Sequence, residues 1–263
     1  MSLLHVSEIV CRFGFVTALD SVSVEVKEGE VIGVVGANGA GKTTFVNAVT
    51  GHSQVTSGNV SFDGENITNR SSRAICRKGV ARSFQVSQLF GSMTVFENLM
   101  ISCAIHRGGA GGRLLPLELT DTRDLARRLV TEFGLENVRD TQVNVLPQGV
   151  RKTVDIAMTV ASEPKLVFLD EPTSGVSRKE KFELMEQVVE PLRHRQVTIL
   201  FVEHDMDIVE KYAQRVLAFF EGRILFDGEV NDALANSEVV SKITGRELGV
   251  RAGSKDCGRE AAF

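Results

Sequence analysis

A glycine-rich segment that ends in a lysine and a threonine carries the clearest chemical signal in this sequence. Residues 36–43 read GANGAGKT and fit the pattern G-x-x-x-x-G-K-[ST]. In such a loop the backbone N–H groups curl around phosphate, and the N-terminus of the following helix adds partial positive charge. The pattern predicts that Lys42 contacts the β- and γ-phosphates of a nucleotide and that Thr43 ligates Mg²⁺. The residues expected to contact the nucleotide here are Gly36, Asn38, Gly39, Ala40, Gly41, Lys42, Thr43 and Thr44.

Two consecutive carboxylates follow the apolar run 166–169. Asp170 is expected at the C-terminal end of a strand beside the phosphate loop, where it can hold the Mg²⁺ shell. Glu171 points in a different direction and can polarise the attacking water. Two solvated carboxylates at the end of a strand are the alternative. Their combination with a phosphate loop favours metal-assisted phosphoryl chemistry.

The elements around these motifs alternate between strand-like and helix-like patterns. Val31 to Val35 is a continuous apolar run, and the phosphate loop and a helix follow it. Such alternation implies an α/β core with a mostly parallel sheet that helices cover. The expected strands are 22–26, 31–35, 59–62 (at an edge), 166–169, 198–202, 216–219 and 224–226, and the expected helices of the core are 45–49, 178–194 and 205–213.

The pattern from about residue 92 to 162 is helical instead. Leu125, Leu129 and Phe133 recur at four-residue spacing, and Gly134 suits the end of that helix. This predicts a helical lobe inserted into the α/β core. The glycine-rich stretch 106–112 is expected to be a linker, because no strand precedes it as a phosphate loop would require.

Composition limits the kinds of protein that fit. Acidic side chains outnumber basic ones, 34 to 30, so the composition lacks the excess of positive charge that is typical of nucleic-acid-binding proteins. The N-terminus lacks the features of a signal peptide, and no apolar run approaches the ~18 residues that a membrane helix needs. The cysteines have no metal-ligand spacing and are expected to be reduced; they are Cys11, Cys76, Cys103 and Cys257. We therefore expect a soluble protein that reaches a membrane only through partners.

In this order, the motifs resemble those of ABC transporter ATPases. A long helical segment separates Lys42 from Asp170, whereas small GTPases and nucleotide kinases usually have less between these elements. The resemblance implies an α/β fold, namely a P-loop ABC ATPase core with an antiparallel β subdomain and an inserted α-helical subdomain. It also implies a single ATPase domain over residues 1–250, with the helical lobe at about 92–162, and a flexible tail over 251–263.

The same resemblance assigns further site residues. Phe13 matches the aromatic residue that stacks on adenine, although Phe15 lies close enough to compete. Gln85 matches the glutamine that contacts Mg²⁺ or water and leads into the helical lobe. His204 matches the histidine that contacts the γ-phosphate and orients the hydrolytic water. The expected catalytic set is therefore Glu171, His204 and Gln85.

Two positions depart from the family pattern. Residues 146–150 read LPQGV where the family signature is commonly LSGGQ. Gly149 and the following helix are retained, so backbone N–H groups can still face a phosphate. Pro147 lacks the hydroxyl that would bond the γ-phosphate bound by a partner, and a hydrogen bond to a charged group is worth ~1.5–3 kcal/mol, so we expect that site to be about 10- to 100-fold weaker. Ser177 stands where many relatives have Asp, so communication between the sites is expected to differ.

The resemblance implies an ATP-hydrolysing subunit that uses ATP and Mg²⁺. Two such subunits, identical or paralogous, would sandwich two ATP molecules and drive two transmembrane permease subunits at the cytoplasmic face of the membrane. A solute-binding protein would act indirectly, and no nucleic acid would be involved. Segments 84–85, 93–99 and 202–206 resemble the ATPases of branched-chain amino acid importers, which implies import of branched-chain or other small amino acids or amides. The alternatives are a soluble non-transport ABC ATPase and a weakly hydrolysing regulatory subunit; Pro147 motivates the second.

Overall fold

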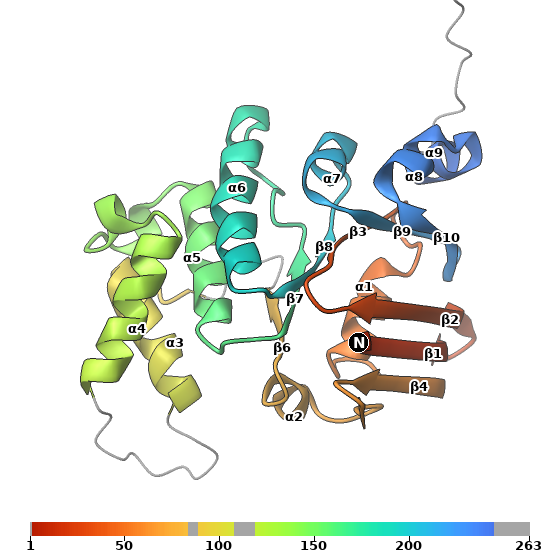
Figure 1. Cartoon of the computed structure of the whole chain (residues 1–263), viewed down its shortest axis with the longest axis horizontal. Helices are drawn as coiled ribbons and strands as arrows, with labels where there is room; N and C mark the ends of the chain where they lie inside the picture. The colour runs from red at the N-terminus through yellow and green to blue at the C-terminus, as the bar shows by residue number, and fades with distance from the viewer. Residues whose placement is uncertain (1, 84–88, 108–118, 245–263) are drawn as a thin grey trace, which may run out of the picture.

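The computed structural model describes residues 2–83, 89–107 and 119–244, and its centre is a six-stranded sheet (Figure 1). The strand order is β10-β9-β3-β8-β7-β6, and all neighbours are parallel except β10 and β9. The strands are β3 Val31–Gly36, β6 Val80–Ser83, β7 Leu166–Asp170, β8 Thr198–Val202, β9 Arg215–Phe220 and β10 Arg223–Glu229. The predicted mostly parallel sheet is confirmed. The short strand β6 was not expected, because its four residues are too few for a recognisable pattern.

A second, antiparallel sheet lies beside the first, in the order β2-β1-β4-β5. Its strands are β1 Ser2–Phe13, β2 Val16–Lys27, β4 Ser57–Phe62 and β5 Glu65–Asn66. β1 was not expected, because a register shift around Glu8, whose φ is +48°, interrupts the alternation of its buried residues. The prediction that 59–62 forms an edge strand is wrong, because the two-residue strand β5 pairs with the outer side of β4.

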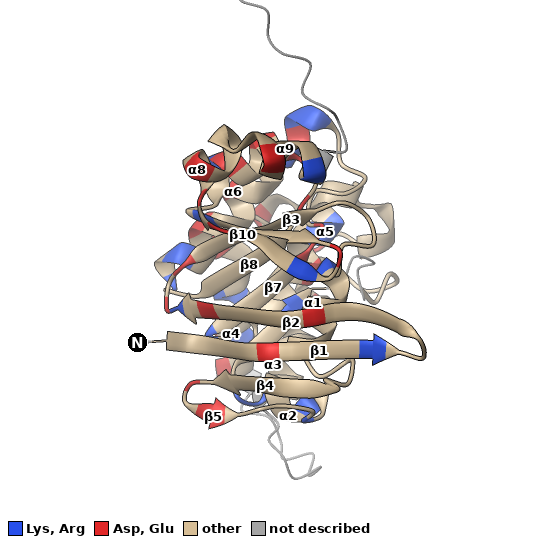
Figure 2. Cartoon of the chain, turned by 90° about the vertical axis from the view of Figure 1, so that its right-hand side faces the viewer, with Lys and Arg blue, Asp and Glu red and all other residues tan. Residues whose placement is uncertain are grey.

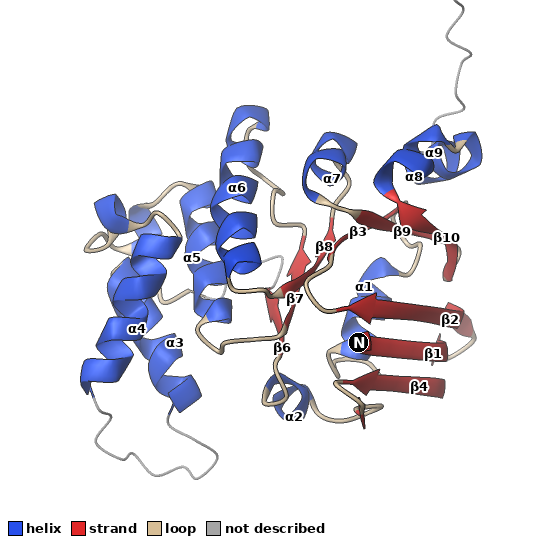
Figure 3. Cartoon of the chain, viewed as in Figure 1, coloured by secondary structure: helices blue, strands red, loops and turns tan. Residues whose placement is uncertain are grey.

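Helices cover the parallel sheet and form the inserted lobe. The described helices are α1 Lys42–Val49, α2 Ser72–Cys76, α3 Val95–Arg107, α4 Leu119–Glu132, α5 Gln148–Val160, α6 Arg178–His194, α7 Met206–Tyr212, α8 Val230–Ala235 and α9 Ser237–Thr244. Helices α3, α4 and α5 lie between β6 and β7 in the sequence, and Figure 3 shows them together on the side away from the antiparallel sheet. The fold class that the resemblance implied is therefore confirmed.

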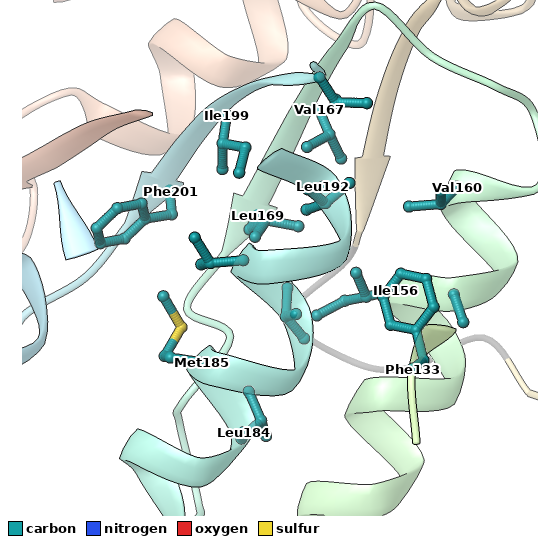
Figure 4. Close-up of a cluster of buried hydrophobic side chains, with 14 of the residues drawn as sticks. Phe133, Ile156, Val160, Val167, Leu169, Leu184, Met185, Leu192, Ile199 and Phe201 are labelled. Carbon is teal, nitrogen blue, oxygen red and sulfur yellow. The ribbon is translucent and has the colours of Figure 1, made fainter. Parts of the chain in front are cut away.

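Alternate residues of the parallel strands face two separate apolar clusters. In β7, Leu166 and Phe168 belong to a cluster shared with α1 and the antiparallel sheet. Val167 and Leu169 belong to a cluster shared with α5 and α6 (Figure 4). Burying one such side chain stabilises the fold by ~1.5–3 kcal/mol. Packing on both faces therefore fixes the end of β7, where Asp170 is the last residue of the strand.

Charged side chains of both signs share the surface. Figure 2 shows acidic and basic residues on the same strands of the antiparallel sheet and on β10. Among the described helices, none combines the length and the apolar character needed to cross a bilayer. Among the described residues, Cys11, Cys76 and Cys103 take part in no disulfide, and Cys257 lies outside the described residues.

Candidate functional site

The phosphate loop connects β3 to α1, and its backbone conformation requires glycine. Gly36, Gly39 and Gly41 have φ values of +147°, +80° and +106°. A Cβ atom on Gly36 would lie 2.4 Å from the carbonyl oxygen of Phe219 on β9, so a larger residue would displace backbone. The loop thus turns tightly at the N-terminus of α1, where free N–H groups and the helix dipole favour an anion.

Lys42 lies inside this loop and is almost fully buried, at 6% exposure. Its Nζ donates hydrogen bonds to the carbonyl oxygens of Gly36, at 2.6 Å, and of Ala37, at 2.9 Å. Burial lowers the pKa of Lys42, and the nearby carboxylates of Glu171 and Asp170 oppose that shift. A buried ammonium held by carbonyl oxygens of its own loop fits a phosphate, which would supply the charge-assisted bonds that carbonyls cannot.

Asp170 occupies the predicted position and has a partner that the sequence did not reveal. Its Oδ2 accepts a hydrogen bond from Arg82 Nη2 at 2.7 Å, and both side chains are only 8% exposed. Arg82 lies on β6, and its Nη1 also donates to Asn47 on α1. The carboxylate of Asp170 and the exposed hydroxyl of Thr43 are hard oxygen donors, which is the chemistry that Mg²⁺ prefers. These donors fit the ion.

Glu171 and His204 are brought together at the ends of β7 and β8. Glu171 Oε1 lies 3.1 Å from His204 Nε2, and both side chains are partly exposed, at 25% and 43%. Glu171 has a left-handed backbone with φ +47°, which is uncommon for a residue with a side chain. A carboxylate and an imidazole in contact at a solvent-accessible strand end can hold and polarise a water molecule.

The buried carboxylate of Glu203 holds the backbone of His204 and of Thr173, two residues after Glu171, and sequence reasoning missed it. It is 4% exposed, and its Oε1 accepts hydrogen bonds from the backbone N–H and the hydroxyl of Thr173, at 2.9 and 2.7 Å. Its Oε2 accepts from the backbone N–H of His204 at 3.2 Å. The acidic residue directly after the apolar residues 199–202 was the available signal, because such a carboxylate needs buried donors.

Two further predicted site residues are the aromatic residue for adenine and the glutamine that leads into the helical lobe. Phe13, at the end of β1, is 53% exposed, and neighbouring Phe15 is fully exposed, so both remain available to stack on a base. Gln85 lies outside the described residues, as does the expected tail over 251–263.

Comparison with known proteins identifies the family. The model of the family described as "ABC transporter" matches residues 19–174. The chain is 33% identical over 251 residues to the probable branched-chain amino acid transport ATP-binding protein LivG of Archaeoglobus fulgidus, covering 94% of this chain and 97% of the relative. It is 32% identical to the high-affinity branched-chain amino acid transport ATP-binding protein BraF of Pseudomonas aeruginosa, covering 92% and 98%. A solved ATP-binding cassette of an ABC transporter in its ADP conformation superposes with a TM-score of 0.80 at 30% identity, covering 94% and 100%.

The chain belongs to the ABC transporter family. As a member it is an ABC ATPase, a nucleotide-binding subunit that hydrolyses ATP. The phosphate loop, Asp170, Glu171 and His204 lie in this ABC ATPase at the carboxyl ends of the parallel strands or directly after them, where open α/β sheets place their sites.

The signature segment of this ABC ATPase, residues 146–150, leads into α5. Pro147 is the N-cap residue of α5 and offers no side-chain hydrogen bond, as the sequence predicted. Gly149 lies in the first turn of the helix and is partly exposed. The side chain of Gln148 packs against Gly175, since a Cβ atom there would lie 2.5 Å from Gln148 Nε2. The signature end of α5 therefore packs against the turn formed by residues 171–177.

Proposed function

We propose that this ABC ATPase hydrolyses Mg²⁺-bound ATP at Glu171 to drive the import of branched-chain or other small amino acids or amides. The observation that carries the hydrolytic assignment is the contact of Glu171 with His204, close to Lys42 and Asp170. The solute class is inferred from the names of the relatives in Archaeoglobus fulgidus and Pseudomonas aeruginosa, which describe branched-chain amino acid transport. We further propose that residues 1–250 form one ATPase domain.

Nucleotide binding falls to the phosphate loop and the hairpin of β1 and β2. The backbone N–H groups of the loop bind the phosphates, together with the side chains of Asn38 and Thr44. Lys42 exchanges its carbonyl partners for the β- and γ-phosphates. Phe13 stacks on adenine, with Phe15 as the competing aromatic.

Asp170 and Thr43 would hold Mg²⁺, with Gln85 as a further proposed ligand. The ion would neutralise charge on the transferred phosphoryl group when it is bound. Arg82 fixes the carboxylate of Asp170 from β6 and so keeps one oxygen donor in a defined place.

Glu171 polarises the attacking water by accepting one of its hydrogen bonds. His204 holds the carboxylate through the 3.1 Å contact and orients the water toward the γ-phosphate. Because Glu203 anchors His204 and the turn that follows Glu171, this chain supplies a preorganised hydrolytic arrangement rather than one that forms only on substrate binding.

A second ABC ATPase subunit would complete each site by presenting its signature helix to the phosphate loop. We propose a related but different subunit as the more effective partner, because Pro147 and Gln148 make the signature of this chain poor. The same residues favour a second candidate function, a regulatory subunit that holds ATP and hydrolyses it slowly. Turnover of the purified chain alone, and then with a paralogue, distinguishes the two.

Two permease subunits are the proposed membrane partners, with a solute-binding protein acting indirectly at the other side. This arrangement places the chain at the cytoplasmic face of the membrane. A cavity of about 670 Å³ between α2, β6 and the lobe helices α3 and α5 is the proposed docking site for a cytoplasmic permease segment. Cys76, Ile105 and Met158 are among its lining residues, and Ile105 is 74% exposed.

The hydrolytic assignment is tested by Glu171→Gln. The variant is expected to bind ATP as the native protein does and to lose turnover, because the amide cannot polarise water as a carboxylate does. ATPase rates and nucleotide affinity measured on the same preparation check this. Near-native hydrolysis by the variant would show that another residue activates the water.

A further inference from the structure

The backbone of Glu171 adopts a conformation that needs support from its surroundings. Its φ of +47° lies in the left-handed region, which residues with a side chain rarely occupy. Such a conformation persists only where neighbouring groups over-determine it, and it concentrates at functional sites.

Three hydrogen bonds hold the backbone of Glu171. The N–H of Glu171 donates to the carbonyl oxygen of Val202 on β8 at 3.0 Å. Its carbonyl oxygen accepts from the N–H of Ser174 at 3.1 Å and from Nζ of Lys152 at 2.7 Å. The bond from Lys152 differs from the other two because its donor is charged and comes from α5, in the inserted lobe.

The side chain of Lys152 lies in the protein interior. It is 6% exposed, and its Nζ donates a second hydrogen bond to Ser174 Oγ at 2.7 Å. Burial lowers the pKa of Lys152, and the carboxylates that raise it are Glu203, Glu171, Asp155 and Asp170. A buried ammonium is tolerated only with such partners. Here the ammonium of Lys152 joins α5 to the 171–177 turn.

Lys152 also lies on the same face of α5 as the signature segment. Gln148 precedes it by one helical turn and packs against Gly175 in the same 171–177 turn. Helix α5 therefore contacts this turn at two points, one at the signature end and one directly at the carbonyl oxygen of Glu171. A displacement of the signature end moves Lys152 with it, because a helix transmits motion along its axis.

We propose that Lys152 is a positioning residue for ATP hydrolysis, which locks the backbone of Glu171 and connects it to the signature helix. This inference rests on the proposed role of Glu171. Lys152 would not touch the nucleotide of its own site. It would instead orient the Glu171 carboxylate toward the water, and so make hydrolysis in one site sensitive to what the signature helix binds in the other.

The test compares Lys152→Met, which keeps the length of the side chain, with Lys152→Arg, which keeps the charge. For Lys152→Met we expect kcat to fall about 10- to 100-fold while the nucleotide Kd stays within about threefold. Lys152→Arg is expected to recover a measurable part of kcat. Lys179→Met, an exposed lysine on α6, is the matched control and should leave kcat unchanged.

Folding is monitored by thermal melting of each variant. Ser174→Ala removes one acceptor of Lys152 and leaves the Glu171 carbonyl in place, so it is expected to lower kcat less than Lys152→Met. If Lys152→Met does not fold, Lys152→Arg and Ser174→Ala carry the test, and native kcat in both overturns the proposal. A native kcat in Lys152→Met also overturns it. A parallel loss of kcat, nucleotide affinity and melting temperature, without recovery by Lys152→Arg, assigns Lys152 a purely structural role and overturns it as well.

The proposed function is tested separately in the same assay by Glu171→Gln. Turnover by that variant contradicts the catalytic assignment itself. Loss of turnover in Glu171→Gln together with native turnover in Lys152→Met contradicts only the role of Lys152.

Discussion

Glu171 and His204 meet across the ends of two neighbouring parallel strands, with Oε1 and Nε2 3.1 Å apart. β7 and β8 pair in a register that sets Asp170 opposite Val202. Glu171 follows the first strand directly, and His204 follows the second after Glu203. Both strands are buried on both faces. The sheet therefore sets the separation of the two side chains.

His204→Ala removes the group that orients the Glu171 carboxylate, and we expect kcat to fall about 100-fold with little change in nucleotide affinity. His204→Gln retains a hydrogen-bonding side chain and should lose less. Steady-state ATPase kinetics check the order of the variants. His5→Ala, on an exposed position of β1, is the control, and a native kcat in His204→Ala contradicts the assignment.

Lys42→Ala is expected to act on nucleotide binding, and not on the hydrolytic step alone. The variant removes the buried ammonium that donates to the carbonyl oxygens of the phosphate loop. We expect the affinity for nucleotide to fall about 100-fold. Titration with a fluorescent nucleotide measures the change. Lys165→Ala serves as the control, because Lys165 is exposed and pairs with Asp63 away from the loop. An unchanged Kd in Lys42→Ala would place the phosphate elsewhere.

The signature segment gives a prediction about the working dimer. Pro147→Ser restores a hydroxyl at the N-cap of α5 and should raise turnover at the site to which this chain contributes its signature, by about tenfold. If the working unit is a heterodimer, the gain requires the paralogue. A large gain in the lone protein, independent of any partner, favours a homodimer instead.

Cross-linking can locate the permease. Phe90 and Met93 are 47% and 36% exposed, whereas Phe96 is partly buried under the guanidinium of Arg139, 4.6 Å from its ring. We therefore expect cysteines at Met93 and at Ile105 to cross-link to a co-expressed permease, and one at Phe96 to react poorly. Cys76 is changed to serine first, because it lines the proposed docking cavity together with Ile105. A cysteine at Glu238 on α9 is the control position, and cross-links only there would exclude this docking site.

Asp205 gives a prediction about stability and pH. It is the N-cap of α7, where its side chain accepts from the N–H of Asp207 at 3.3 Å and from Lys181 Nζ at 2.8 Å. Asp205→Ala should lower the free energy of unfolding by about 0.5–2 kcal/mol at neutral pH. Asp205→Asn keeps a capping oxygen and loses only the ion pair, so its loss should be smaller.

The pH dependence of this effect follows from the pKa of Asp205. The hydrogen bond from Lys181 lowers that pKa below its ordinary value of 3.8. A carboxyl group whose pKa is lower in the folded state stabilises the fold above its unfolded pKa and loses that contribution as the pH falls through the folded pKa. The difference between native protein and Asp205→Ala in urea unfolding should therefore be full at neutral pH and shrink as the pH falls below the ordinary value of 3.8. A constant difference would mean that the ionised form of Asp205 is not what stabilises α7.

Much of the fold could be predicted because local patterns determined it. The expected helix 178–194 coincides with α6, since Ser177 and Glu180 form a capping box at its start. The apolar runs at 31–35 and 198–202 form β3 and β8. β1 could not be predicted, because its bulge at Glu8 is a property of its pairing and leaves no regular pattern.

The motifs of the site were also recognisable, but its cross-connections were not. Arg82 reaches Asp170 only because β6 and β7 are neighbours in the sheet, although the two strands are far apart in the sequence. Lys152 reaches Glu171 only through the packing of α5 on the 171–177 turn. Neither residue belongs to a motif, so a single sequence contains no signal for either contact.

One apolar cluster spans the lobe and the core. It contains Leu99 of α3, Phe133 directly after α4, and Val154 of α5, and it continues without interruption to Leu169 and Met185 on the core side. The lobe and the core therefore share this cluster, and each would expose a large apolar face if it were separated from the other. The protein should thus melt in a single cooperative transition, and a fragment that carries only the lobe should aggregate rather than fold.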